Sequence, residues 1–405
     1  MRNAVIIVAF LAAFPAAGSW TSAAAQAVGE RSAEATSVSG VVFADSNGNG
    51  TMDAGERGVE GVLVSDQEQV VATDAAGRFT LEARGYGIVE VVQPEGWAVE
   101  GAFWRRVERG ASVSFALRPW DTGGDVTFVH ASDTHVSAQS VGRLRRVREM
   151  VDSIAPDFVI ITGDLVRDAL RVTEAEARGY YELLEAELAA FSVPVYTVPG
   201  NHEKFGIERH NSLIGKDHPL YGNRMYRTYR GPNYHAFHAG GVLFMGLDDV
   251  DYDDLWYYGN VDSLQLAWMD GILARTGADT PVVTFGHIPF MSANMTRYGY
   301  TDEGLAPTLI RIDGVDRFRH VVANHEEVLR RVGDRLAVAL AGHIHVREIT
   351  EYETQGGSLR LETAAAVVGP AAGVGGDRDP ISGITVYRVR DGKVDGGEFL
   401  ALEGR

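Results

Sequence analysis

Five short polar motifs between residues 133 and 345 carry side chains that can bind metal ions. They are Asp133-Thr-His135, Gly163-Asp164, Gly200-Asn201-His202-Glu203, Gly286-His287 and Gly342-His343-Ile-His345. Imidazole nitrogens, carboxylates and a carboxamide oxygen suit divalent cations of hard to borderline character. One carboxylate can bridge two cations about 3.5–4 Å apart, and such a pair can clamp the attacking and leaving oxygens of a phosphoryl group. The motifs therefore predict a metal centre.

Each motif follows an apolar stretch that we interpret as a buried strand. The stretches are residues 126–130, 158–162, 195–199, 281–285 and 336–341. Because ligand sites of open α/β sheets lie beyond the carboxyl ends of strands, we expect the five loops to converge. In the Asp-x-His and His-x-His pairs, residues i and i+2 of an extended backbone point to one side. The glycines allow the backbone to approach the site closely, since no Cβ stands in the way. A single such motif is more often a turn, but five in this order favour a metal centre.

The elements that position these motifs change character along the chain. From residue 125, strands alternate with helices expected over 141–154 and 174–191, which predicts a layered α/β domain over 125–346. The tail, 347–405, returns to strands near 359–363 and 384–389, and we expect this β extension to add to one sheet. Residues 36–118 hold short, turn-bounded apolar runs typical of a small all-β sandwich, and we interpret 118–124 as a linker.

The composition narrows the class of protein. The 405 residues are 45% hydrophobic and 23% charged, which is typical of a globular protein. The net charge of −18 argues against a dedicated nucleic-acid-binding protein, whose affinity would come from basic side chains. With no cysteine, the chain has neither disulfides nor thiolate metal sites.

Residues 1–27 have the pattern of a secretory signal peptide. Arg2 supplies the positive charge, residues 4–14 the apolar core, and Ala25-Gln26-Ala27 the small-residue cleavage signal. The apolar core is too short to span a bilayer, so we expect cleavage rather than anchoring and no transmembrane segment in the mature chain. The chain is thus predicted to be exported, to the periplasm, the cell surface or the medium.

In this order, the five motifs resemble the calcineurin-like metallophosphoesterase superfamily over residues 125–346. The resemblance implies a four-layer α/β sandwich and a phosphoric ester hydrolase with a dinuclear centre of Mn, Zn or Fe. It implies two cation sites that share one carboxylate, the first with Asp133, His135, Asp164 and His345 and the second with Asp164, Asn201, His287 and His343. It further implies that a metal-bound hydroxide attacks phosphorus, while His202 protonates the leaving oxygen or stabilises the transition-state charge. The substrate would be a phosphomonoester or phosphodiester, and the oligomeric state stays open.

Two departures from known subfamilies surround Arg167. Purple acid phosphatases carry a metal-binding tyrosine three residues after the bridging aspartate, where this chain has Arg167, which disfavours a tyrosinate-ligated ferric centre. Protein Ser/Thr phosphatases read Gly-Asp-x-x-Asp-Arg, whereas Arg167-Asp168 has the reverse order, which disfavours protein phosphatase activity. Arg167 itself either contacts the substrate phosphate or forms a surface ion pair.

Several further residues have open interpretations. The long segment from His202 to Val242 is expected to shape the substrate site, and the aromatic residues of 252–258 either wall the cleft or pack within their loop. The histidines outside the motifs are interpreted as core or surface residues: His130, His210, His218, His235, His238, His320 and His325. The acidic run Asp248, Asp249, Asp251, Asp253 and Asp254 is interpreted as a solvated face.

Residues 45–56 match the twelve-position calcium loop. The oxygen ligands would be Asp45, Asn47, Asn49, Thr51 through its carbonyl, Asp53 and Glu56. The flanks are not helical, so the segment is not an EF-hand; it resembles calcium-binding B-repeats of bacterial adhesins and the N-terminal domain of exported calcineurin-like phosphoesterases. We expect a structural calcium here, with an ion-free hairpin turn as the alternative.

The leading functional hypothesis is an exported metal-dependent phosphoesterase. One alternative is a cell-envelope or glycan-binding surface protein whose β domain carries the function. A third hypothesis keeps the metals but has them hydrolyse a non-phosphate ester or an amide.

Overall fold

The computed structural model describes residues 36–403, apart from residues 85, 109, 123, 254, 295–307, 356 and 370–380. The expected signal peptide, residues 1–27, lies outside the described residues. No helix in the described part is long and apolar enough to cross a membrane.

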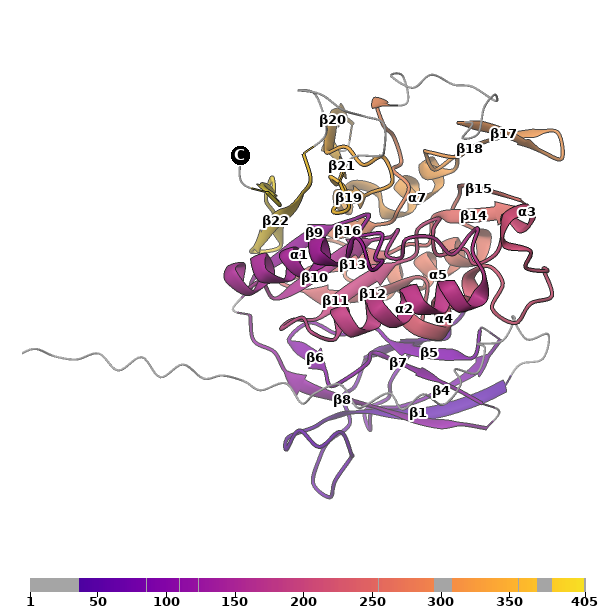
Figure 1. The fold of residues 1–405 in the computed structure, drawn as a ribbon. Helices are drawn as coiled ribbons and strands as arrows, with labels where there is room; N and C mark the ends of the chain where they lie inside the picture. Colours follow the sequence, from indigo (N-terminus) through magenta and orange to yellow (C-terminus); the bar gives the residue numbers. More distant parts are fainter. Residues whose placement is uncertain are drawn as a thin grey trace, which may run out of the picture.

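Residues 36–119 form two packed β-sheets, at the bottom of Figure 1. One sheet has the order β4-β1-β8-β6 and the other β3-β2-β5-β7. The strands are β1 (Thr36–Ala44), β2 (Leu63–Ser65), β3 (Val70–Ala72), β4 (Arg78–Ala83), β5 (Ile88–Val91), β6 (Trp97–Val99), β7 (Trp104–Arg106) and β8 (Ser112–Pro119). In β4 every second side chain is buried, as expected of a strand with one solvated face. Phe79 and Leu81 of this strand pack with Val89 and Phe115 in the core, so the predicted β-sandwich is confirmed.

Two larger sheets make up the centre of the remaining chain. One has the order β11-β10-β9-β22-β23, with β24 also paired to β22, and the other has the order β12-β13-β16-β19-β21-β20. The first contains β9 (Asp125–Ala131), β10 (Phe158–Thr162), β11 (Val195–Val198), β22 (Gly383–Arg390), β23 (Lys393–Val394) and β24 (Glu398–Ala401). The second contains β12 (His235–Ala239), β13 (Val242–Gly246), β16 (Val282–Phe285), β19 (Leu336–Ala341), β20 (Glu348–Thr354) and β21 (Gly357–Thr363).

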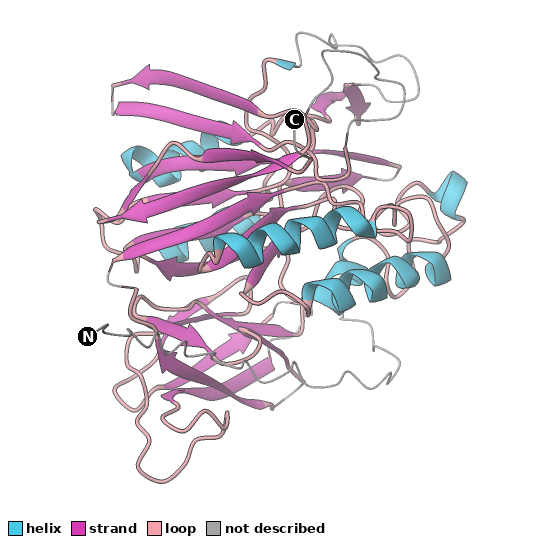
Figure 2. Ribbon diagram, turned by 60° about the vertical axis from the view of Figure 1, so that its left-hand side comes forward, coloured by secondary structure: helices cyan, strands magenta, loops and turns pink. Residues whose placement is uncertain are grey.

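Helices cover the outer faces of these sheets, and aromatic side chains fill the space between them. Phe128 of β9 stacks on Phe158 of β10 and meets Phe244 of β13 edge to face, which joins the two sheets. The helices are α1 (Val141–Ile154), α2 (Glu174–Leu188), α3 (Arg209–Ser212), α4 (Asn223–Arg230), α5 (Ser263–Leu273), α7 (His325–Val332) and the 3₁₀ turn η1 (Gly333–Arg335). Packing of α1 and α2 on the first sheet, and of α5 and α7 on the second, gives four layers (Figure 2). The predicted four-layer α/β sandwich is therefore confirmed.

The sequence led us to expect that the C-terminal strands would extend one sheet. In the structure they add to both central sheets. β21 runs parallel to β19 in the second sheet, whereas β22 pairs antiparallel with β9 in the interior of the first. An apolar sequence pattern indicates that a segment forms a buried strand, but it does not indicate which of two sheets the strand joins.

Residues of helix α4 and around strand β12 connect the α/β part of the chain to the N-terminal sandwich. The Gln67 side-chain amide donates to the Tyr234 carbonyl over 3.0 Å, and the Tyr234 hydroxyl donates to the Gln67 carbonyl over 2.5 Å. The Arg227 guanidinium lies 3.3 Å from the centre of the Tyr86 ring. Within residues 202–242, which we interpreted as a substrate-shaping loop, residues 223–239 form a helix and a strand, and several of them contact the N-terminal sandwich.

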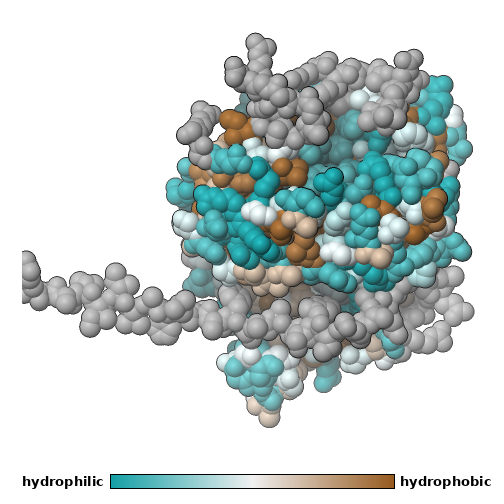
Figure 3. All heavy atoms as spheres, viewed as in Figure 1, coloured by the Kyte–Doolittle hydropathy of each residue, from teal (hydrophilic) through white to brown (hydrophobic). Residues whose placement is uncertain are grey.

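Two further hairpins are β14 (Val250–Asp253) with β15 (Trp256–Gly259), and β17 (Leu309–Ile312) with β18 (Val315–Phe318). Both lie on the upper right of Figure 1, away from the N-terminal sandwich. The face of the α/β part seen in Figure 3 is largely hydrophilic, with apolar residues scattered over it, which is an ordinary surface for a globular domain.

Candidate metal centre

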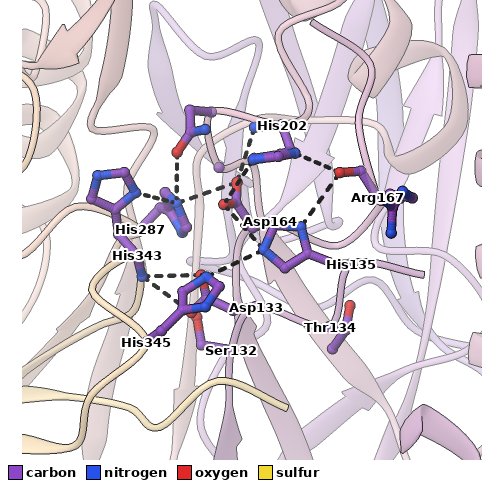
Figure 4. A network of polar contacts seen from close by, with 12 residues as sticks. Ser132, Asp133, Thr134, His135, Asp164, Arg167, His202, His287, His343 and His345 are labelled. Carbon is purple, nitrogen blue, oxygen red and sulfur yellow. Dashed lines mark hydrogen bonds and ion pairs between the residues drawn. The ribbon is translucent and has the colours of Figure 1, made fainter. Parts of the chain in front are cut away.

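The five polar motifs meet at the carboxyl ends of five strands. β9, β10 and β11 are parallel neighbours in the first sheet, and β16 and β19 are parallel neighbours in the second. Parallel neighbours bring their carboxyl ends to the same edge of a sheet. The loops that follow these strands therefore place their side chains together, as Figure 4 shows.

The backbone at the candidate ligands is unusual. Among the described residues, ten non-glycine positions have positive φ, and five of them are motif residues: Asp133, His135, Asp164, His343 and His345, with φ of 53°, 40°, 47°, 70° and 61°. The expectation of an extended backbone in the Asp-x-His and His-x-His pairs is therefore wrong. Left-handed backbone costs of order 1–3 kcal/mol per non-glycine residue and persists where the surroundings enforce it, which is common at functional sites.

Hydrogen bonds between neighbouring loops hold this backbone in place. The backbone N–H of Asp133 donates to the Gly163 carbonyl over 3.1 Å, and that of His135 donates to the Asp164 carbonyl over 2.9 Å. The hydroxyl groups of Ser132 and Thr134, which flank Asp133, donate to the carbonyls of Thr162 and Leu165 over 2.9 and 2.8 Å. The first two motifs thus form one rigid unit.

Glycines make room for this close packing at two positions. A Cβ on Gly200 would lie 2.3 Å from Asp164 Oδ1, and one on Gly342 would lie 1.8 Å from the Ser132 hydroxyl oxygen. Both distances are far below van der Waals contact, so each position requires a residue without a side chain. The predicted close approach of glycine backbone to the site holds at these two loops.

The first donor group consists of Asp133, His135, Asp164 and His345, whose ligand atoms all lie within 4.8 Å of one another. His345 Nε2 is 3.2 Å from Asp133 Oδ1 and 3.3 Å from His135 Nε2, which in turn is 3.6 Å from Asp164 Oδ2. Asp133, His135 and Asp164 are buried and His345 is half-buried. Two carboxylates and two imidazoles facing one point form a donor set suited to a divalent cation.

The second donor group shares Asp164 with the first and adds His287 and His343. His287 Nε2 lies 3.3 Å from Asp164 Oδ1, 3.2 Å from Asn201 Oδ1 and 3.1 Å from His343 Nδ1. The structure therefore brings all seven predicted metal-binding side chains into two groups that meet at Asp164. Their donor atoms fit the pair of divalent cations that the sequence predicts.

Local charges and burial keep several of these side chains in the protonation state that binds a cation. Burial alone would raise the pKa of Asp164, but the charges of His287 and His202 outweigh burial and hold this pKa well below its usual range. Burial lowers the pKa of His135 to about 4, and it also lowers the pKa of His343. At neutral pH the carboxylate is therefore ionised and both imidazoles are neutral, as ligands must be.

His345 and His287 are exceptions. Burial alone would lower the pKa of the His345 imidazole, but the charge of Asp133 raises this pKa above its ordinary value. His287 shows the larger effect. Burial alone would lower the pKa of its imidazole, but the charges of Asp164 and Asp133 raise this pKa to about 10. The backbone carbonyl of Thr162, 2.8 Å from Nδ1, accepts one of the ring protons. A cation that binds Nε2 must displace the other proton, so binding at the second group is coupled to proton release.

His202 stands beside both groups with one ring nitrogen fixed. Its Nδ1 donates to the Arg167 carbonyl over 2.5 Å, and its Nε2 lies 3.8 Å from Asp164 Oδ2. Its ring packs edge-on against the His135 ring, with 4.5 Å between their centres. Because a carbonyl accepts from Nδ1, Nε2 is the nitrogen that faces the centre (Figure 4). The Arg167 side chain is exposed, so its carbonyl oxygen is the part of this residue that contacts the centre.

Two buried acidic residues, to which the sequence analysis gave no role at the site, accept hydrogen bonds from the backbone of the ligand-bearing loops. Glu203 accepts three backbone N–H groups: those of Leu165 and Val166 on Oε1, over 2.9 and 3.0 Å, and that of Gly200 on Oε2, over 2.6 Å. Asp249 Oδ1 accepts the N–H groups of His287 and Ile288, each over 3.0 Å. Each carboxylate therefore fixes a loop that carries candidate ligands.

The interpretation of the acidic run as a solvated face is wrong at its beginning. Asp248 and Asp249 are buried, and the Lys204 ammonium lies 2.6 Å from Asp248 Oδ1. A signal for Asp249 was present in the sequence, because it follows a sixth apolar strand at the same edge of the second sheet. Asp254 lies outside the described residues.

The predicted calcium loop is a separate, mostly exposed cluster. Asp45 is buried and accepts the backbone N–H groups of Gly48 and Gly50, each over 2.7 Å. The side-chain amides of Asn47 and Asn49 donate to Asp53 Oδ2, and Glu56 Oε1 accepts from the Ser46 backbone N–H. The side chains therefore satisfy one another, and calcium binding stays a prediction.

The fold and the two donor groups are those of a metal-dependent hydrolase. A comparison with protein families identifies which kind of hydrolase this is. The family model for calcineurin-like phosphoesterases matches residues 126–347, more than half of the chain, so the chain belongs to the calcineurin-like phosphoesterase family. The predicted resemblance is thereby confirmed, and the chain is a phosphoric ester hydrolase with a metallophosphoesterase domain.

The solved structures to which this chain is similar include the following two. A dimetal phosphatase from Danio rerio is 16% identical, with a TM-score of 0.42 over 66% of this chain and 93% of that one. The structure of GAP50, the anchor in the inner membrane complex of Plasmodium, is 11% identical, with a TM-score of 0.40 over 69% of this chain and 85% of that one. No curated protein matches the chain.

Proposed function

We propose that this chain is an exported phosphoesterase that hydrolyses phosphomonoesters or phosphodiesters at a centre of two divalent cations. The observation that carries the proposal is the position of Asp164. Its Oδ2 faces His135 of the first donor group, and its Oδ1 faces His287 of the second. One carboxylate between two donor groups is the arrangement that holds two cations close enough to act on one phosphoryl group.

Asp133, His135, Asp164 and His345 would hold the first cation, and Asp164, Asn201, His287 and His343 the second. When bound, two divalent cations stabilise negative charge on phosphoryl oxygens and lower the pKa of a water molecule at the centre. The left-handed loops and the N–H groups that Glu203 and Asp249 accept fix the ligands before the substrate arrives. This rigidity limits the reorganisation needed during the reaction.

His202 is proposed to deliver a proton to the oxygen of the leaving group. The Arg167 carbonyl fixes the ring through Nδ1, so Nε2 is the nitrogen that can carry the transferred proton. The side chain is 21% exposed, which gives substrate access to it, whereas Asp164 beside it is almost fully buried. A partly exposed imidazole at the edge of a buried donor cluster is better placed to act as a general acid than to bind a cation.

The direct test is an assay of the metal-depleted mature protein with Mn²⁺ or Zn²⁺ on p-nitrophenyl phosphate and on bis(p-nitrophenyl) phosphate. We expect turnover that rises with added metal and saturates at two cations per chain. Faster cleavage of the diester would indicate a phosphodiesterase, and faster cleavage of the monoester a phosphomonoesterase. Failure to cleave either ester by a folded, metal-loaded protein would contradict the proposal and favour the surface-binding alternative.

Export is supported by the charge, apolar core and small-residue signal of residues 1–27. N-terminal sequencing of the protein recovered outside the cytoplasm should begin near Val28. Recovery of the chain in the cytoplasm with Met1 intact would contradict export and leave the enzymatic proposal untouched.

A further inference from the structure

The segment 308–325, which lies between the fourth and fifth motifs and is called the insertion below, brings an additional histidine to the metal centre. It includes the β17–β18 hairpin, and His320 follows two residues after β18. Backbone hydrogen bonds tie the residues after His320 to other elements. The Val322 N–H donates to the Pro289 carbonyl over 3.0 Å, and the Ala323 N–H donates to the Gly259 carbonyl over 2.9 Å. The position of His320 is therefore set by backbone contacts to the rest of the domain.

His320 contacts His343 on the side of the ring that faces away from the donor cluster. The distance from His320 Nδ1 to His343 Nε2 is 2.6 Å, and the ring centres are 4.9 Å apart. The other nitrogen of His343, Nδ1, lies 3.1 Å from His287 Nε2 in the second donor group. The two nitrogens of His343 thus have different partners, one in the candidate cation site and one in the insertion.

Aromatic and cationic contacts hold the His343 imidazole from a second direction. The Tyr257 ring meets the His343 ring edge to face, with 6.0 Å between their centres. The Arg319 guanidinium lies 4.2 Å from the centre of the Tyr257 ring, within the range of a cation–π contact. Tyr257 and Arg319 are both buried, so this side of the centre is packed.

We propose that His320 is a positioning residue for the second cation site, an inference that rests on the proposed dinuclear centre. His343 Nε2–H donates to His320 Nδ1, which leaves the lone pair of His343 Nδ1 directed at the second donor group. A hydrogen bond to the distal nitrogen of a metal-binding imidazole fixes both its tautomer and its ring orientation. His320 therefore acts through His343 and contacts neither the cation nor the substrate.

The test measures metal binding rather than turnover. The metal-free mature protein is titrated with Co²⁺, with bound metal followed by equilibrium dialysis and the coordination by visible absorption. In His320→Ala we expect the affinity for one of the two equivalents to fall about 10–100-fold, the usual effect of losing such a partner. The affinity for the other equivalent should stay as in the wild type.

Two further variants separate positioning from a general structural effect. His320→Asn retains an acceptor close to where Nδ1 stands, so it should restore most of the lost affinity and the wild-type absorption spectrum. His325→Ala is the matched control, because His325 belongs to the same insertion but its Nδ1 contacts the Val322 carbonyl instead of the centre. It should bind both equivalents like the wild type.

The outcomes test the positioning role of His320 separately from the proposed dinuclear centre on which it depends. If the wild type binds two equivalents and folded His320→Ala binds both equally well, the positioning role is wrong. If His320→Ala does not fold, His320→Asn decides: wild-type binding of both equivalents supports the role, and weak binding of the second equivalent contradicts it. A wild type that binds fewer than two equivalents would instead overturn the dinuclear centre.

Discussion

The metal centre and the loop of residues 45–56 both gather cation-binding side chains, but the chain builds them in opposite ways. The centre takes its donors from positions 133 to 345, buries most of them and holds five in left-handed backbone. The loop takes its donors from twelve consecutive positions and leaves them exposed, apart from the buried Asp45 and the half-buried Glu56. In the loop, amide groups of Asn47 and Asn49 already satisfy Asp53, whereas in the centre imidazole nitrogens lie 3–4 Å from carboxylate oxygens.

The difference shows what each site would lose without its ion. An exposed loop can satisfy its oxygens with its own N–H groups and with water, so its ion adds stability without being indispensable. A buried cluster of carboxylates and imidazoles has no such substitute, because desolvated charges need a partner. We therefore expect the centre to depend on its cations for activity and the loop to respond to calcium only in stability.

The largest expected effect comes from the carboxylate shared by the two donor groups. Asp164→Ala should lose both metals and all turnover, because Asp164 is the residue common to both. Metal content by mass spectrometry and hydrolysis of both p-nitrophenyl esters measure this. Asp168→Ala is the matched control, since Asp168 pairs with Arg171 near the same loop, and it should retain two cations. Retention of two cations by Asp164→Ala would refute the bridging role.

A smaller effect on rate, with no effect on metal content, is expected at His202. His202→Ala should bind both cations but lose roughly 10²–10⁴ in kcat, the usual contribution of a positioned acid. The exposed His210 serves as a control, and His210→Ala should match the wild type. Near-wild-type turnover in His202→Ala would show that the proton comes from elsewhere.

A substitution of Glu203 tests whether stability depends on the hydrogen bonds that this side chain accepts from the ligand-bearing loops. In Glu203→Gln the new amide group would face the Gly200 N–H and leave one buried donor unsatisfied. This should lower the free energy of unfolding by about 1–3 kcal/mol, measured by denaturant titration. The exposed Glu182→Gln on α2 should leave stability unchanged. Equal stability of both variants would mean that the Glu203 contacts are dispensable.

Calcium at the loop should produce the smallest effect. With 1 mM calcium and a Kd on the order of 10⁻⁴ M, typical of extracellular sites, binding would stabilise the loop by about 1.4 kcal/mol. Amide hydrogen exchange of residues 46–56 with calcium and with chelator measures this, in the Asp164→Ala background so that the centre contributes nothing. Identical exchange in both conditions would leave the ion-free hairpin turn as the correct description.

The sequence predicts the parts of this molecule whose signals are local. A buried strand followed by a short polar motif recurs five times, four times with a glycine before the polar residue. That repetition is enough to place Asp133, Asp164 and His287 at one sheet edge. The left-handed backbone of Asp133 and Asp164 escapes prediction, because it arises from hydrogen bonds to other loops. His320 escapes it as well, since nothing in its immediate sequence marks a contact with a residue 23 positions away.

The pairing of β22 with β9 sets the order in which the centre can assemble. β9 leads directly into Asp133 and His135, and one of its sheet neighbours is residues 383–390, close to the end of the chain. The N–H groups of Val367 and Val368 also donate to the carbonyls of Ser132 and Asp133. During synthesis, the first loop therefore lacks these partners until residues 367–390 have been made. In an exported chain, as proposed above, the complete centre would form only after translocation, so the cations it meets first would be those of the destination compartment.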